Sequence, residues 1–404
     1  MDERNTRECV LADLARNDGL LPMRPCWVTR DFLPPGKRLG LTDAEYAAGE
    51  RGYVCERWLV SETKAGNAID TPYEGQSYLK TSSAVPILLI DALKVCRDEL
   101  LGASYANRHA GLDRLLKIYD FKAPLFYHMH QMKADADRVG MNSKEEAHHY
   151  LDADPGSRPE IFLGVQPAIV REHRQEEVFT QYLERWEGDS ILEHAVAFNS
   201  VAGEGFHLPA GILHAPGTAL NLELQESSEV MAVLQAEIDG IKINKKMLCQ
   251  HIAADALQAK KERAVLDQID WRACIDPHIY ENHRLYPHPI SGSLPKGVSE
   301  EWVWYNTTKF SGTRVTLQPG AVYVSKGLGV HGLFIWRGRG LVDEFLVEGQ
   351  KVSLADSRDE FLVAHDKALK GVTLTNIGAD PLVLFKFFGP EINDAVIPWI
   401  ERRA

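Results

Sequence analysis

The sequence lacks the long apolar runs that membrane-spanning helices require. A bilayer-crossing helix needs roughly 20 consecutive apolar residues, and the longest such stretch, around Val85–Ile90, is far shorter. The first ten residues, MDERNTRECV, contain acidic side chains and no apolar core, so they do not resemble a secretory signal. We therefore expect a cytoplasmic protein with no membrane partner.

Cysteine pairs and basic blocks are also missing. The 6 cysteines are scattered and form no CxxC pair, a usage typical of reduced, structurally inert thiols. The formal net charge is -12, and no run of Lys or Arg interrupts the acidic balance. Sequence-independent binding to nucleic acid depends on such basic surface, so the composition argues against it.

What the sequence does contain is enough chain for two or three domain-sized pieces, with 404 residues of ordinary globular composition. Turn signals separate short β-like runs over residues 1–80. Helical spacing is expected at 86–118, 167–186 and 244–268. Seven β-like runs then follow at residues 301–390, at a spacing typical of an antiparallel barrel or sandwich.

We therefore divide the chain into three segments. Residues 1–235 are expected to form an N-terminal β-barrel with helical insertions. Residues 236–300 are expected to be a helical or linker segment, and residues 301–404 a second barrel. The expected fold is mainly β, with two barrels and inserted α-helices.

The first chemical signal is the run Phe126–His130, which contains His128 and His130 two residues apart. On a strand, residues i and i+2 point to the same face, so both imidazoles would project into the barrel. Two later segments add to this pair. Glu146 enters a predicted strand, and His214 follows a Pro-Ala-Gly turn at the start of another. Three imidazoles and one carboxylate suit Zn, Mn, Fe, Ni or Co.

These motifs resemble the cupin superfamily, and in particular type I mannose-6-phosphate isomerases. That family has an LLK run before a Pro-Leu strand that ends in histidine, then K-x-E, PAG-x-x-HA and E-x-Q-x-SS. The corresponding residues here are Leu116–Asp120, Pro124–His130, Lys144–Glu146, Pro209–Ala215 and Glu223–Glu229. The convincing match covers residues 116–230. The resemblance implies two cupin-type jelly-roll barrels and a metal-dependent aldose–ketose isomerase of carbohydrate metabolism.

Residue by residue, the resemblance implies that His130, Glu146 and His214 bind one metal ion, most commonly zinc. His128 stands where the family usually has glutamine, and it completes the three-histidine, one-glutamate set of cupins in general. Lys144 and Glu223 match a lysine and an acid near the family's active site, so they are the candidate catalytic residues. His148 shares a face with Glu146, whereas Glu145 points away from it.

The family places an arginine ten residues after the acid, and here that position is Val233. We therefore expect mannose 6-phosphate to be a poor substrate and a different sugar or sugar phosphate to be preferred. Two other functions remain open. Three histidines and a glutamate could hold iron for a cupin dioxygenase, or the protein could bind sugars without catalysis.

The C-terminal piece offers a looser set of potential ligands. His331 is not part of an HxH pair, and the other members are Asp359, Glu360, His365 and Asn376. We therefore expect a metal-free second barrel that packs against the first or forms a homodimer.

Overall fold

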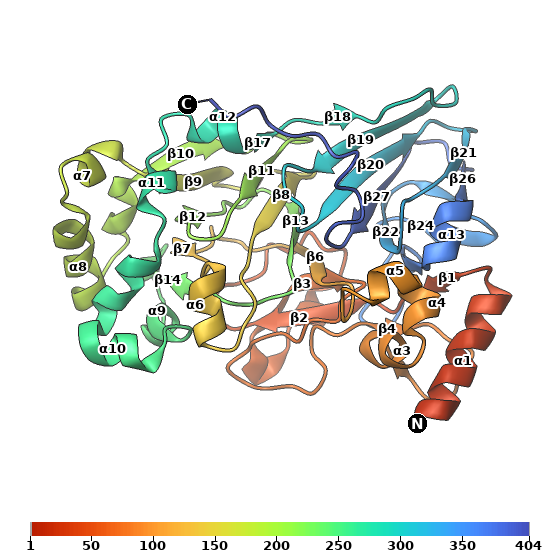
Figure 1. Ribbon diagram of the computed structural model, residues 1–404, viewed down its shortest axis with the longest axis horizontal. Coiled ribbons are helices and arrows are strands. Elements are labelled where there is room, and N and C mark those ends of the chain that lie inside the picture. The colour runs from red at the N-terminus through yellow and green to blue at the C-terminus, as the bar shows by residue number, and fades with distance from the viewer. Residues whose placement is uncertain (1, 404) are drawn as a thin grey trace.

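The computed structural model describes residues 2–403 and is mainly β, as the sequence predicts. Figure 1 shows the strands across the middle of the molecule and helices gathered at both ends of its long axis. The N-terminus lies at the start of α1 (Glu3–Arg16), and the other end of this helix approaches α13 (His365–Lys370) of the C-terminal half.

Two antiparallel sheets of the first half contain most of the predicted metal ligands. The larger has seven strands in the order β17-β11-β8-β13-β6-β3-β2, and the smaller has five in the order β10-β9-β12-β7-β14. The bounds in the larger sheet are Arg284–Leu285, Gly205–Leu208, Glu146–Tyr150, Asn221–Glu226, Arg114–Tyr119, Tyr53–Leu59 and Cys26–Arg30. Those in the smaller sheet are Ala195–Asn199, Glu160–Val165, His214–Ala215, His128–Met129 and Ala232–Val233.

The second half has a similar pair of sheets, in the orders β1-β25-β22-β27-β20-β19-β18 and β21-β26-β23-β24. The first comprises Leu20–Pro22, Glu360–Val363, His331–Arg337, Leu382–Phe388, Ser311–Leu317, Val298–Trp304 and His288–Pro289. The second comprises Val322–Ser325, Val372–Asn376, Arg339–Val342 and Phe345–Glu348. The seven predicted runs are all strands here, and β23 and β24 are additional. Strand β1 comes from the N-terminus and pairs with β25, so the start of the chain completes the C-terminal sheet.

Each sheet of residues 2–403 is open, and none closes on itself into a barrel. Short helices cover the ends of the sheets. They are α3 (Leu89–Val95), α4 (Arg97–Leu101), α5 (Ala103–Ala106), α6 (Lys133–Arg138), α7 (Pro167–Arg171), α8 (Gln175–Arg185), α9 (Lys246–Cys249), α10 (Ala254–Lys260), α11 (Trp271–Cys274) and α12 (Ile279–His283). Two further short elements are α2 (Asp43–Tyr46) and β4–β5 (Tyr78–Leu79 with Ile87–Leu88).

Two expectations about local structure were wrong. The segment 1–80 was expected to hold only strands and turns, but it begins with α1, whose N-terminus is capped by Asp2 accepting from the Asn5 amide. The helical spacing at 86–118 ends earlier than predicted, because Arg114–Tyr119 forms strand β6. This strand is fully buried in the middle of its sheet, and its short apolar stretch Leu115–Leu116 does not by itself distinguish a strand from a helix.

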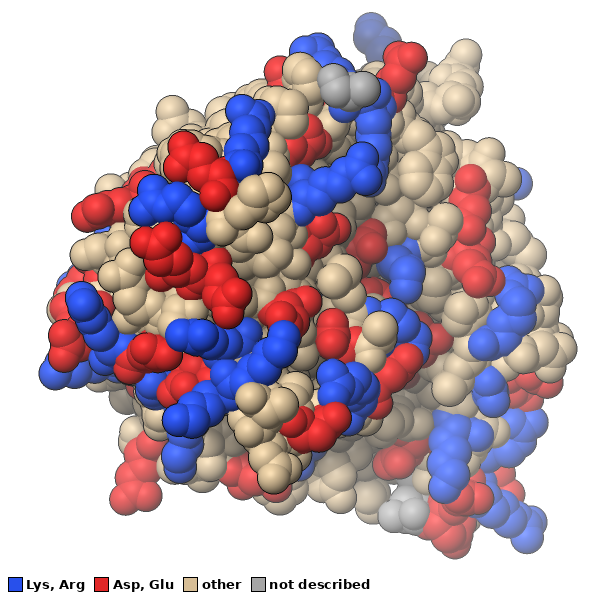
Figure 2. Space-filling view, turned by 60° about the vertical axis from the view of Figure 1, so that its left-hand side comes forward, with Lys and Arg blue, Asp and Glu red and all other residues tan. Residues whose placement is uncertain are grey.

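No helix within residues 2–403 is long and apolar enough to cross a membrane. Figure 2 shows the end that carries α7 and α8 turned toward the reader, with basic side chains lying among acidic ones over this face. Such mixed charge lacks the continuous basic surface that nonspecific nucleic-acid binding uses.

The buried ring of His331 makes stability depend on pH. Burial, together with the charges of Lys386 and Arg114, lowers the pKa of His331 to about 3, while an unfolded histidine has a pKa of about 6.5. Below pH 6.5 the unfolded chain therefore binds more protons, and the free energy of unfolding falls by about 1.4 kcal/mol per pH unit from this ring.

When the pH is lowered from 7.5 to 5, the free energy of unfolding should fall by about 2 kcal/mol less in His331→Asn than in the wild type. Urea denaturation at both pH values measures this difference. Equal losses in the two proteins would show that His331 titrates normally in the fold.

Candidate metal centre

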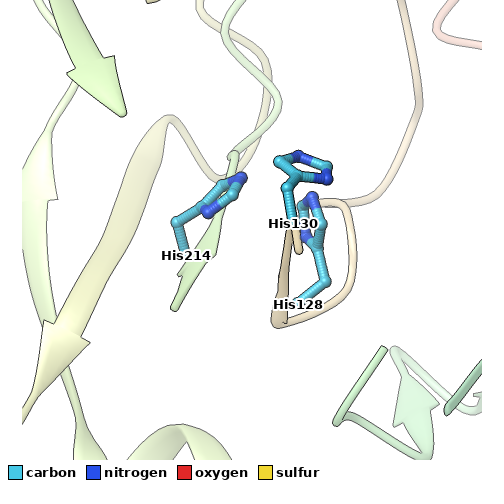
Figure 3. A group of neighbouring side chains, drawn as sticks. All are labelled: His128, His130 and His214. Carbon is cyan, nitrogen blue, oxygen red and sulfur yellow. The ribbon is translucent and has the colours of Figure 1, made fainter. Parts of the chain in front are cut away.

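Three histidines converge between the two sheets of the first half. His214 pairs directly with His128 in the register of β12 and β7, and His130 follows β7 by one residue. One nitrogen from each ring lies within 4.8 Å of the others, and all three side chains are buried. Figure 3 shows the rings turned toward one another from these two adjacent segments.

Backbone carbonyl groups fix the orientation of each ring. The Nδ1 atoms of His128, His130 and His214 lie 2.8, 2.7 and 2.9 Å from the carbonyl oxygens of Phe126, Val230 and Ile212. In the tautomer that makes these bonds, Nδ1–H donates and Nε2 keeps a free lone pair. This is the form in which imidazole binds a metal.

Two of these histidines, His128 and His130, are also held in their neutral state. Burial, and then the neighbouring Lys144 ammonium, lowers the pKa of His130 to about 4. Burial and the other two rings hold the pKa of His128 well below its usual range. Both rings are therefore unprotonated at neutral pH, so they can donate lone pairs to a cation.

Glu146 supplies the fourth potential ligand from the facing sheet, at the start of β8. Its Oε2 lies 3.0 Å from His130 Nε2, and its Oε1 lies 3.1 Å from His214 Nε2. His214 Nε2 is buried and has no hydrogen-bond partner. Acceptors in such close contact are stabilised by a cation between them. Ligands about 2.1 Å from one zinc ion lie about 3.4 Å apart, so the residues fit a bound divalent ion.

Lys144 and Glu223 border this group of ligands. Lys144 Nζ lies 2.8 Å from Glu146 Oε2, 3.2 Å from His130 Nε2 and 3.2 Å from Glu223 Oε1. Burial and Glu146 raise the pKa of Glu223, but Lys117 and Lys144 outweigh them and lower it to about 2. Glu223 is therefore a carboxylate that holds two ammonium groups beside the potential metal ligands.

Lys117 and His148 complete the network. Neither was among the metal-binding or catalytic residues predicted from the sequence. Lys117 Nζ lies 3.0 Å from Glu223 Oε1. His148 Nε2 lies 3.1 Å from Glu146 Oε1, and 3.5 Å from Glu223 Oε2. The signal for Lys117 was its place in the Leu116–Asp120 motif, and for His148 it was the alternation of β8. That alternation also turns Glu145 away, toward His207 Nε2 at 2.7 Å.

The position of the family's arginine lies in apolar surroundings. Val233 on β14 is fully buried in a cluster that includes Cys55 and Phe126. Arg30 lines the neighbouring cavity but does not replace the missing arginine. All of its donor nitrogens are bound, by Glu56, Glu229, Asn67 and the Gly66 carbonyl.

A cavity of about 1040 Å³ opens beside these residues, and we call it the front cavity. Lys144, His128, His130 and Glu223 lie in its wall. Its cations are mostly paired with carboxylates, as Lys64 is with Asp70 at 2.6 Å. Within the described part of the chain, Lys242 and Lys246 are its only cations with no carboxylate within 4.0 Å.

The C-terminal residues proposed as further ligands do not converge. Asp359 and Glu360 both bind Arg57, at 2.6 and 2.9 Å. The Asn376 amide donates to the carbonyls of Leu317 and Asp380, and His365 pairs with the adjacent Asp366. Within residues 2–403, no group of three ligand atoms forms in this half.

No family model matches the chain. A mannose-6-phosphate isomerase of Salmonella typhimurium is 22% identical over 214 residues, which are 51% of this chain and 50% of that protein. The chain thus matches about half the length of this curated relative.

Solved structures match over almost the whole chain. A mannose 6-phosphate isomerase from Bacillus subtilis has a TM-score of 0.59 at 15% identity, over 91% of this chain and 99% of that one. A zinc-bound mannose 6-phosphate isomerase has a TM-score of 0.61 at 13% identity, over 92% and 100%. The resemblance predicted from the motifs is confirmed, and the chain has the fold of the mannose-6-phosphate isomerases.

Proposed function

We propose that the protein is a metal-dependent aldose–ketose isomerase that acts on a sugar phosphate. The observation that supports this most strongly is the buried set of three imidazoles and Glu146, which converge from two facing sheets. The fold similarity to mannose-6-phosphate isomerases, one of them solved with zinc, agrees with this function. His128, His130, Glu146 and His214 would hold a single ion, with zinc expected.

The ion would supply a Lewis acid that stabilises the negative charge developing on the sugar oxygens when the C2 proton leaves. The chain's own residues must then move that proton from C2 to C1. Lys144 is the candidate, because its Nζ lies 2.8 Å from Glu146 Oε2 and the residue lines the front cavity. It would act as the neutral amine, which becomes an ammonium on taking the proton from C2 and returns to the amine on giving that proton to C1. Glu223 would position Lys144 and Lys117 through the contacts at 3.2 and 3.0 Å.

Substrate phosphate would bind at Lys242 and Lys246. A phosphate dianion needs positive charge that is not already neutralised, and the other cations of the front cavity have carboxylate partners. The two lysines lie four positions apart, on β16 (Ile241–Lys242) and at the start of α9. This anchor would replace the arginine that is absent at Val233.

Replacing both lysines by alanine is expected to raise the KM for the phosphorylated substrate by about tenfold while kcat changes little. The reason is that the phosphate is remote from the reacting carbons and is bound equally in the ground and transition states. Steady-state kinetics measures the split. Lys309→Ala, which removes a lysine paired with Glu226, is the matched control. An unchanged KM in the double variant would place the phosphate elsewhere.

The proposed activity can be tested on protein purified without metal-affinity resin. Elemental analysis should find about one equivalent of metal, and a panel of aldose phosphates and neutral aldoses should include one that is converted to its ketose. We expect mannose 6-phosphate to react more slowly than the preferred substrate. Sugar binding without turnover across the panel would contradict catalysis, and oxygen consumption with bound iron would favour a dioxygenase.

We further propose that residues 1–235 and 301–404 are two cupin-type units joined by residues 236–300. Each unit would be a jelly-roll-like pair of facing sheets, and the pairing of β1 with β25 would tie the first to the second. The homodimer and the cytoplasmic location expected from the sequence stay predictions.

A further inference from the structure

A second cavity, of about 300 Å³, lies on the opposite face of the sheet that lines the front cavity, and we call it the rear cavity. Successive residues of one strand point to opposite faces of a sheet. On β3, Glu56 lines the front cavity and Arg57 the rear one. On β6, Lys117 and Ile118 divide in the same way. The two cavities therefore share these strands as a common wall.

The floor of the rear cavity is a row of residues across three strands. Arg57 on β3 pairs in register with Trp27 on β2 and with Ile118 on β6. The roof comes from the C-terminal half, where Phe334 and Trp336 alternate on β22. The guanidinium carbon of Arg57 lies 5.6 Å from the Trp27 ring centroid and 5.5 Å from that of Phe334. Aromatic side chains from both halves thus line the cavity.

Polar groups are fewer, and one of them is unsatisfied. Arg57 is only 3% exposed, and its terminal nitrogens bind Asp359 at 2.6 and 2.8 Å. Its Nε–H is buried and has no partner. A buried donor without an acceptor costs about 1–3 kcal/mol, so an acceptor atom supplied by a ligand would be favoured here. Gln350 adds an amide where the cavity reaches the surface.

The cations that line the rear cavity are all paired with carboxylates, whereas, among the described residues, Lys242 and Lys246 of the front cavity are not. Lys37 binds Asp43, Arg38 binds Asp120 and Arg57 binds Asp359, with a salt bridge of 2.6 Å between the side chains of each pair. No cation is left for a phosphate or a carboxylate, so an occupant of this cavity is uncharged.

We propose that the rear cavity is a binding site for a neutral monosaccharide. Its volume is at the lower end for ligand pockets and equals about ten waters at liquid density, which suits one sugar ring. A pyranose presents C–H groups on its faces and hydroxyls around its rim. The aromatic walls match the faces, while Arg57 Nε–H, Asp359 and Gln350 match the rim. The site does not depend on the function proposed for the front cavity.

Methyl α-D-mannopyranoside is a suitable probe, because its blocked anomeric carbon prevents isomerisation. Its binding to the full-length protein can be measured by saturation-transfer NMR and calorimetry. Val352→Trp fills the cavity from its partly exposed edge, and we expect it to weaken binding about tenfold or more. Trp336→Ala removes an aromatic wall and should act in the same direction. Val324→Trp, on an exposed strand outside both cavities, is the matched control.

Binding should persist in His214→Ala, because this residue belongs to the candidate metal centre and does not line the rear cavity. Loss of binding in His214→Ala, with Val352→Trp unaffected, would assign the glycoside to the front cavity and overturn the proposal. Binding of indole without binding of the glycoside would also overturn it, in favour of a planar aromatic ligand. Thermal unfolding of each variant shows whether weakened binding comes from the cavity or from loss of the fold. If Trp336→Ala does not fold, the result for Val352→Trp alone tests the proposal.

Discussion

Replacing His214 by alanine is expected to reduce bound metal from about one equivalent to less than about a tenth. The side chain is 1% exposed, and its Nε2 faces Glu146 with no other partner. Removing one of four ligands costs more than the 10–100-fold in affinity that is typical when only a ligand's hydrogen-bond partner is removed. Elemental analysis after dialysis measures the content, and activity should fall with it.

The matched control is His288→Ala, which removes an exposed histidine far along the sequence from the ligand group. It should retain full metal and activity. His130→Ala should behave like His214→Ala, since the Nε2 of His130 also faces Glu146, at 3.0 Å from its Oε2. Full metal content in both His130→Ala and His214→Ala would defeat the assignment of this centre.

The metal ligands could be proposed from the sequence because local rules place them. Alternation on a strand brings His128 and His130 together, and a tight turn at Gly211, with φ of 88°, delivers His214 to the neighbouring strand. The alternation of side chains along a strand does not determine the register in which two strands pair. The direct pairing of His214 with His128, and the approach of Glu146 from the other sheet, depend on strands that are far apart in sequence.

The roles of the lysines could not be predicted in the same way. Lys117, Lys144, Lys242 and Lys246 look alike in sequence, and their functions differ through the carboxylates that each one meets. Lys117 and Lys144 share Glu223, while the other two have no carboxylate partner among residues 2–403. Such pairings follow from tertiary contacts over about 80 residues or more. The rear cavity was hidden for the same reason, because its floor and roof come from different halves of the chain.

Shared strands also explain why the first half tolerates so many buried charges. Glu56, Lys117 and Glu223 all point to the front face of one sheet, where each carboxylate meets an ammonium or guanidinium group. Removing one partner of such a network leaves an uncompensated buried charge, which typically destabilises the fold by roughly 3–5 kcal/mol. Variants of this network should therefore conserve shape and be checked for folding before activity is interpreted.

Lys144→Met is expected to lower kcat by about 10²–10⁴-fold while about one equivalent of metal remains bound. Methionine keeps the length of the side chain but has no ionisable nitrogen, so the proton transfer between C2 and C1 loses its proposed carrier. Because Lys144 is 3% exposed and contacts Glu146 and Glu223, the folding of the Lys144→Met variant is checked by thermal unfolding. Exchange of the C2 proton with solvent deuterium, followed by NMR, should slow in parallel with turnover.

Lys133→Met is the control, because this exposed lysine pairs with Asp137 on the helix surface and lies outside the front cavity. It should leave kcat unchanged. If Lys144→Met loses its metal, the lysine mainly supports the ligands. If it keeps both metal and wild-type kcat, another group moves the proton, and Lys117, which shares Glu223, becomes the residue to replace next.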